Sequence, residues 1–170
     1  MGQPDLNAVK DDATNVRVGI LGLGARELDI REYKDCSFAQ LGQLFKDLTN
    51  EINTNWRRGR KTFIFIYYAG HGELDGLTFV LLNDAMKRRF PIEMCLRALG
   101  TNEGGYVVAI LDCCRSKCDS TIKRGKDDEE VVVLDESGVY RNTFVTFACP
   151  PHSGVDERST IAVEYFAKLR

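Results

Sequence analysis

Two reactive side chains each follow a long apolar segment of this sequence. His71 stands between two glycines after the apolar run 62–68, and Cys114 follows the apolar run 106–111. A free thiol has a pKa of about 8.5 and is mostly protonated near neutral pH. A neighbouring imidazole can accept that proton and later protonate a leaving amine. The two residues would therefore suit nucleophilic catalysis if the fold brings them together.

The backbone near these residues offers a second catalytic element. Gly72 lets the chain pass close to a substrate, so its N–H and that of Cys114 are candidate donors to an oxyanion. Each reactive residue also has a plainer interpretation when taken singly. A buried cysteine is usually a packing residue, and a lone histidine more often lies on the surface or in a hydrogen-bonded core.

The elements that must position these residues alternate between helices and strands. Apolar spacing predicts helices over 5–23, from Ser37 onward with a Ser37–Gln40 capping box, over 91–99, and after a cap at Asp156 or Ser159. Continuous apolar runs predict strands over 62–68, 79–82, 106–111 and 143–148, and residues 28–33 could form a further short strand. This order favours a three-layer α/β/α sandwich with a mainly parallel sheet. Active sites in such folds lie beyond the carboxyl ends of the strands.

Composition narrows the remaining possibilities. The 170 residues fit one domain, and a net charge of −2 gives no support for nucleic acid or an acidic membrane as a partner. The sequence contains no apolar run long enough to span a membrane and no signal-peptide pattern, so we expect reduced cysteines and a cytoplasmic location. Cys113, Cys114 and Cys118 lack a second ligand pair at zinc-site spacing, and no C-x-x-C motif supports redox chemistry.

The segments Tyr67–Gly72 and Leu111–Ser116 resemble the histidine and cysteine motifs of the caspase-like peptidase superfamily. They occur in the family's order, and the resemblance extends over nearly the whole chain. It implies a caspase-like fold and a cysteine endopeptidase. In the family the nucleophile lies two positions after an aspartate or glutamine, which here makes it Cys114, counted from Asp112.

Within that superfamily, the acidic residues make metacaspases and paracaspases the most similar groups. Those enzymes line the substrate pocket with two aspartates, which correspond to Asp112 and to Asp12, six residues after Leu6. Paired carboxylates favour a guanidinium or an ammonium group. We therefore expect protein or peptide substrates cleaved after Arg or Lys. Asp12 could instead be a solvated helix carboxylate, and Asp156 and Glu157 are further substrate-binding candidates that could equally be exposed loop charges.

The resemblance also suggests how the domain is organised. It divides residues 1–170 into a large-subunit-like part over 1–115, a charged linker over about 116–141 and the start of a small-subunit-like part over 142–170. Lys123, Arg124 and Lys126 in the linker are candidate self-cleavage sites, or simply part of a flexible charged loop.

Other properties of relatives transfer less directly. No acidic run matches the calcium cluster of metacaspases, so we expect no cofactor and no metal. The family's first and last strands have no counterpart in the sequence, which leaves open both a homodimer and an interaction or scaffold domain with weak or lost proteolysis.

Overall fold

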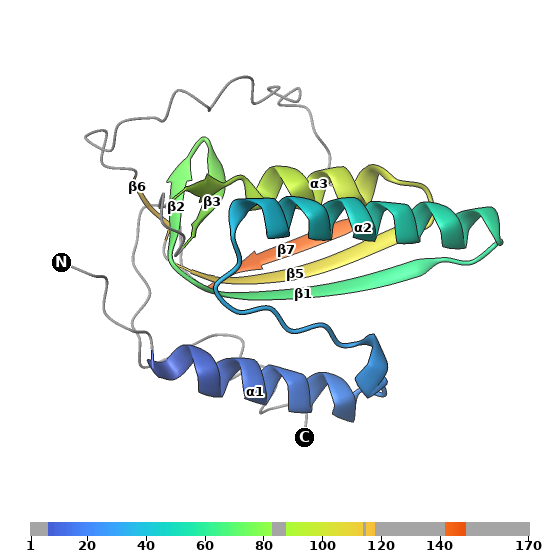
Figure 1. Cartoon of the computed structure of the whole chain (residues 1–170), viewed down its shortest axis with the longest axis horizontal. Coiled ribbons are helices and arrows are strands. Elements are labelled where there is room, and N and C mark those ends of the chain that lie inside the picture. Colours follow the sequence, from blue (N-terminus) through green and yellow to red (C-terminus); the bar gives the residue numbers. More distant parts are fainter. Residues whose placement is uncertain (1–6, 83–87, 114, 118–141, 149–170) are drawn as a thin grey trace.

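The computed structural model describes residues 7–82, 88–113, 115–117 and 142–148, with side chains described from Asp12 onward except at 116–117. These residues form three layers, in which a central sheet has two helices on one face and one helix on the other (Figure 1). The predicted α/β/α sandwich is confirmed, and its sheet is mainly parallel.

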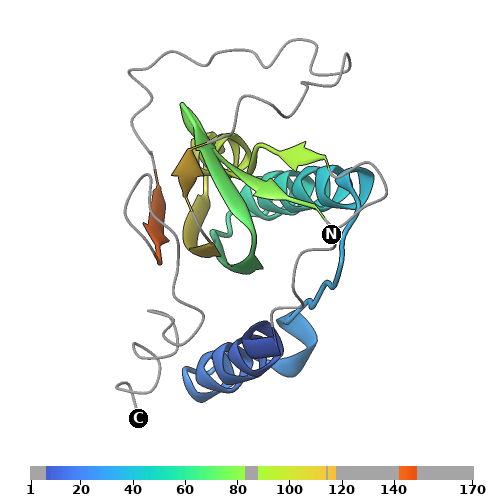
Figure 2. The ribbon, with the colours of Figure 1, turned by 90° about the vertical axis from the view of Figure 1, so that its left-hand side faces the viewer.

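The central sheet consists of three parallel strands in the order β1-β5-β7. They span Thr62–Gly70, Gly105–Cys113 and Thr143–Phe147. Figure 2 shows the three strands side by side, with β1 and β7 at the two edges of the described sheet. The apolar runs extend along both faces of these strands because helices cover both faces.

A second, smaller sheet adjoins the carboxyl ends of the main strands. Its order is β4-β3-β2-β6, formed by Arg89–Phe90, Leu77–Leu81, Gly72–Asp75 and Ser116–Lys117. The β2–β3 and β3–β4 pairs are antiparallel, whereas β2 and β6 are parallel. The chain therefore passes directly from β1 through His71 into β2, and residues 116–117 pair with β2 rather than leaving the fold.

The three described helices begin and end close to where the sequence predicts, and the helix expected after Asp156 or Ser159 lies outside the described residues. The first, α1, spans Asn7–Gly22, α2 spans Phe38–Arg57, and α3 spans Ile92–Thr101. The capping box at the start of α2 is present, because the Ser37 hydroxyl accepts the Gln40 N–H and the Gln40 side chain accepts the Ser37 N–H. Such a pair satisfies two of the N–H groups that a helix start leaves without partners.

Alternation along β1 assigns its side chains to two separate cores. Ile64, Ile66 and Tyr68 pack with buried residues of α2 and α3, including Ile52 and Leu96. On the opposite face, Phe65 and Tyr67 pack with Val16 and Ile20 of α1 and with Ile110 of β5. Every second residue of a strand faces the same side, so the chemistry of the sheet can differ between its two faces.

The short strand expected over 28–33 is wrong. Glu27–Asp29 forms a 3-10 helix, and the residues that follow it up to α2 make no ladder pairing within the described chain. A strand needs a hydrogen-bonded neighbour, and no described strand forms a ladder with this segment. The backbone at Ile30 is nevertheless extended, with φ −90° and ψ 125°.

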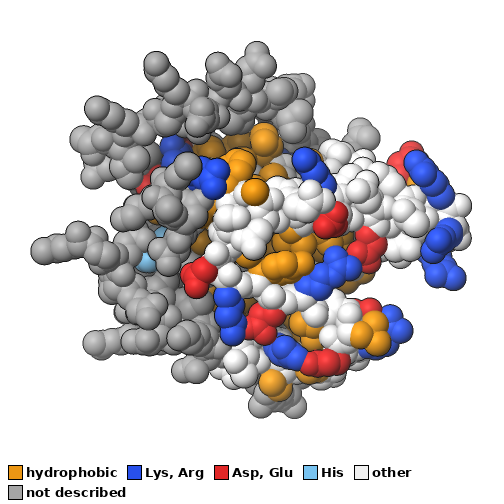
Figure 3. Space-filling view, in the orientation of Figure 1, with side chains coloured by type: hydrophobic (Ala, Val, Ile, Leu, Met, Phe, Trp, Pro, Cys, Tyr) orange, Lys and Arg blue, Asp and Glu red, His pale blue; other side chains and the backbone are white. Residues whose placement is uncertain are grey.

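Apolar side chains remain open to solvent on the face where β1 forms the sheet edge. Figure 3 shows them between the α2 layer and the α1 layer, among charged groups of both signs. Phe63 of β1 is 68% exposed there, and Phe144 of β7, at the opposite edge of the described sheet, is 63% exposed. In the described part of the chain, no helix is both long enough and apolar enough to cross a membrane.

Candidate active site

The carboxyl ends of β1 and β5 lie side by side, as the sequence predicts for the strands that precede His71 and Cys114. The two strands pair in parallel over nine residues each, from Thr62 with Gly105 to Gly70 with Cys113. His71 is the next residue after the first strand and Cys114 the next after the second. Cys114 itself lies outside the described residues, so the separation of thiol and imidazole stays a prediction.

The backbone of His71 is held from two directions. Its carbonyl oxygen accepts the Leu81 N–H of β3 at 2.9 Å and the Tyr68 hydroxyl at 2.9 Å. Tyr68 approaches from the α2–α3 face of the sheet, where burial raises the pKa of its phenol and keeps the group a neutral donor. Two donors on one carbonyl fix the peptide plane between His71 and Gly72, and with it the Cα that bears the imidazole.

Gly70 is required by this arrangement. A Cβ at this position would lie 2.6 Å from the Tyr68 hydroxyl oxygen and 3.0 Å from the ring carbon that bears it. The residue also has φ +157°, which L-residues rarely adopt. Any side chain at position 70 would therefore displace the hydroxyl that holds His71.

Two carboxylates are buried together on the α1 face. Asp112 of β5 is 6% exposed and Asp12 of α1 is 9% exposed. Burial raises the pKa of Asp112, the Tyr67 hydrogen bond opposes that rise, and the negative charge of Asp12 adds to it. Asp12 is thus not a solvated helix carboxylate, and the two predicted specificity residues lie within electrostatic reach of each other.

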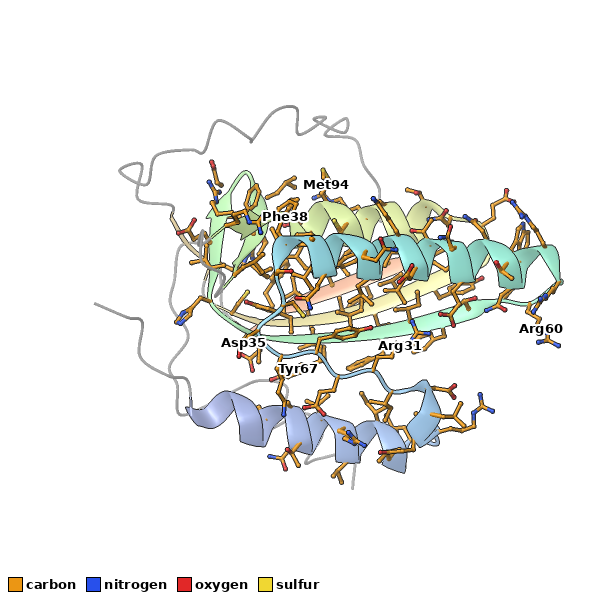
Figure 4. The ribbon with its side chains drawn as sticks, in the orientation of Figure 1. Arg31, Asp35, Phe38, Arg60, Tyr67 and Met94 are labelled. Carbon is orange, nitrogen blue, oxygen red and sulfur yellow. The ribbon has the colours of Figure 1, made fainter. Side chains whose placement is uncertain are left out.

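Tyr67 joins this pair and was missed as a functional residue by sequence reasoning. Its hydroxyl donates to Asp112 Oδ2 at 3.1 Å, and Figure 4 shows the side chain between β1 and α1. Burial and the neighbouring Asp112 raise the pKa of Tyr67, so its phenol stays protonated and can only donate to the carboxylate. The sequence signal that could have identified Tyr67 is the alternation of side chains along a strand, which places Tyr67 on the opposite face of the sheet from Tyr68.

The register of β2 and β3 determines the direction of the Gly72 N–H. Leu81 N–H bonds to the His71 carbonyl, and the next pair along is Gly72 with Val80. Hydrogen-bonded and non-hydrogen-bonded pairs alternate in an antiparallel ladder. The Gly72–Val80 pair is therefore of the second kind, and the N–H of Gly72 points away from β3.

The residues flanking position 114 are firmly packed. Cys113 is 1% exposed and belongs to the core between the sheet and α2–α3. The guanidinium carbon of Arg115 lies 3.8 Å from the ring centroid of Phe147 in β7, a cation–π contact that ties the end of β5 to its neighbouring strand.

Several predicted site residues cannot be placed. Besides Cys114, the substrate-binding candidates Asp156 and Glu157 and the self-cleavage candidates Lys123, Arg124 and Lys126 lie outside the described residues. In the described ranges, no group of three or more His, Cys, Asp or Glu side chains is arranged to hold a metal ion.

Comparison with known proteins identifies one family. A family model described as the caspase domain matches residues 2–162, nearly the whole chain. No curated protein sequence matches the chain significantly.

Proposed function

The chain belongs to the caspase domain family of cysteine peptidases, and we propose that it is an endopeptidase that cleaves after Arg or Lys. Cys114 is the nucleophile in this proposal and His71 the general base and acid. The β1–β5 register is the main support for the proposal. Its last pair is Gly70 with Cys113, so His71 follows β1 and Cys114 follows β5 at the same end of the sheet.

The chemistry follows the usual division of work between a thiol and an imidazole. His71 takes the proton of Cys114, and the thiolate sulfur bonds to the carbonyl carbon of the scissile peptide. The imidazolium then protonates the leaving amine as the C–N bond breaks, leaving a thioester. Water, deprotonated by His71, hydrolyses that thioester and regenerates the free thiol.

The negative oxygen of the tetrahedral intermediate needs donors beside the nucleophile. The N–H of Gly72 supports this role, because the ladder leaves it directed away from β3. The N–H of Cys114 is the second proposed donor. Preorganised donors of this kind typically contribute about 10²–10³ in rate each.

Preference for basic residues rests on Asp12 and Asp112. Both are buried, and the negative charge of Asp12 makes ionisation of Asp112 less favourable. A guanidinium or ammonium group placed between them would relieve that repulsion and gain charge-assisted hydrogen bonds. The acidic side chain of an aspartate substrate would instead add a third negative charge.

Irreversible labelling tests the proposed function directly. The probe is a short peptide ending in Arg with a thiol-reactive acyloxymethyl ketone, and mass spectrometry reports the modified residue. We expect wild type and Cys113→Ala to be labelled and Cys114→Ala to remain unmodified. Cys113 is the matched control because it is the adjacent thiol but is buried in the core.

The same experiment separates the peptidase from a caspase-like scaffold domain. Absence of labelling in wild type, or labelling that survives Cys114→Ala, would favour the scaffold. Equal labelling rates with an Asp-ending probe and the Arg-ending probe would be consistent with a peptidase but would contradict the preference for basic residues.

A further inference from the structure

Tyr67 makes a contact that the catalytic pair does not explain. It lies four residues before His71 on β1, but its side chain faces α1 and its hydroxyl donates to Asp112 Oδ2 at 3.1 Å. The neighbouring Tyr68 faces the opposite side and donates to the His71 carbonyl instead. Adjacent tyrosines of one strand thus contact the two different parts of the proposed machinery.

The Asp112 carboxylate needs such a donor if it is to bind a cation. Burial and the nearby Asp12 both favour the neutral acid, and Tyr67 is the group that opposes them. A neutral carboxylic acid would offer a guanidinium neither its charge nor its full set of acceptors. Because the phenol of Tyr67 itself stays protonated, it donates whether or not a substrate is bound.

The hydrogen bond also has a geometric effect. It engages Oδ2, one of the two carboxylate oxygens, and so restrains rotation of the carboxylate about its terminal torsion, which is otherwise soft. A fixed carboxylate plane is what a bidentate or fork-shaped donor such as arginine recognises best.

From these contacts we propose that Tyr67 is a positioning residue that determines the preference for basic substrates by holding Asp112 ionised and correctly turned. The inference rests on the proposed function, since it assigns a role to the carboxylate that binds the substrate cation. It assigns Tyr67 no contact with the reacting atoms.

The test compares two substrates that differ only in charge. Peptides ending in Arg and in citrulline, whose neutral ureido group has nearly the same shape, are cleaved by the full chain and by Tyr67→Phe. We expect kcat/KM for the Arg peptide to fall about tenfold, mainly through KM, because a hydrogen bond to a charged group is lost. The citrulline peptide should change little, and the acid limb of the Arg profile should move to higher pH.

Tyr68→Phe is the matched control, because it removes one hydroxyl from the neighbouring residue of the same strand. Its hydroxyl bonds to the His71 carbonyl rather than to Asp112. We expect it to lower kcat for both peptides by the same factor and to leave the Arg-to-citrulline ratio unchanged.

Two results would overturn the proposal. One is an equal loss on both peptides in Tyr67→Phe with an unmoved acid limb, which would reduce Tyr67 to a structural role. The other is an identical titration of Asp112 in wild type and Tyr67→Phe, measured by carbon-13 NMR of the aspartate carboxyls. This measurement needs no enzymatic activity, and we expect Asp112 to titrate at higher pH in Tyr67→Phe. Failure of the proposed function looks different, since wild type would then cleave neither peptide, or both equally.

Discussion

Replacing Gly70 with alanine tests whether the Tyr68 hydroxyl positions His71. The new Cβ would lie 2.6 Å from the hydroxyl oxygen, closer than Cβ atoms approach any heavy atom in real structures. The hydroxyl must therefore move, and the hydrogen bond to the His71 carbonyl, 2.9 Å in the native arrangement, must lengthen or break. The Leu81 N–H would remain as the second donor on that carbonyl.

Two effects set the size of the destabilisation. A φ of +157° in an L-residue costs about 1–3 kcal/mol. The lost hydrogen bond adds about 1 kcal/mol. We expect the free energy of unfolding to fall by about 2–4 kcal/mol, which lowers Tm by roughly 5–15 °C in a domain of this size.

A double-mutant cycle with Tyr68→Phe isolates the collision from the backbone strain. Without the hydroxyl, the closest contact of the new Cβ is the ring carbon at 3.0 Å, so part of the cost disappears. Gly70→Ala should then cost about 1–2 kcal/mol less in the Tyr68→Phe background than in wild type. The assay is chemical denaturation of all four proteins, followed by the labelling rate with the Arg-ending probe, which should drop about 10²-fold in Gly70→Ala if His71 is displaced.

The control for backbone strain is Gly76→Ala. Gly76 also has a positive φ, +71°, but a Cβ there would meet no atom within 4 Å. It should lose about 1–2 kcal/mol of stability and show no coupling to Tyr68→Phe. Costs that add within about 0.5 kcal/mol for Gly70→Ala and Tyr68→Phe would show that the hydroxyl does not meet position 70 and would refute the reasoning.

Three further substitutions or treatments follow from particular contacts. Burial raises the pKa of Asp112 above 3.8, so the native state binds this proton more tightly than the unfolded chain does. The stability that Asp112 contributes is therefore complete below pH 3.8 and is lost as the pH rises through the pKa of the native state. Urea denaturation should show Asp112→Asn to be more stable than wild type at neutral pH but not at pH 3. Burial raises the pKa of Cys95 to about 11, and Cys113 is 1% exposed. Iodoacetamide at pH 7.5 should therefore leave both thiols of the native protein unmodified, as mass spectrometry would report. Rapid modification of either thiol would contradict this packing. Ser37→Ala removes the side-chain half of the capping box and should cost about 1 kcal/mol by thermal denaturation, whereas an unchanged Tm would mean that the cap contributes nothing.

The sequence was informative where local pattern and fold rules agree. The runs before His71 and Cys114 are continuously apolar because β1 and β5 are covered on both faces, and parallel neighbours bring their carboxyl ends together. The capping box could be predicted for a different reason, since Ser37 and Gln40 interact within one turn of the chain.

Prediction failed where structure depends on partners distant in the sequence. The segment from Leu28 to Tyr33 contains Leu, Ile and Tyr, which can occupy a strand, but these residues cannot show whether a pairing strand is available. The two-residue strands β4 and β6 form only because β3 and β2 provide their pairing partners. Both are too short for any periodicity to be visible.

The separate roles of Tyr67 and Tyr68 show why a motif does not disclose all of its functions. In the sequence nothing distinguishes the two tyrosines, which are adjacent and both belong to the apolar run before His71. In the sheet, alternation turns one hydroxyl toward the Asp112 carboxylate and the other toward the His71 carbonyl. Exchanging either for phenylalanine keeps the apolar run intact, and a one-residue slip of β1 against β5 would turn each hydroxyl to the other face. The β1–β5 register, more than the identity of either tyrosine, is what links substrate preference to the position of the catalytic histidine.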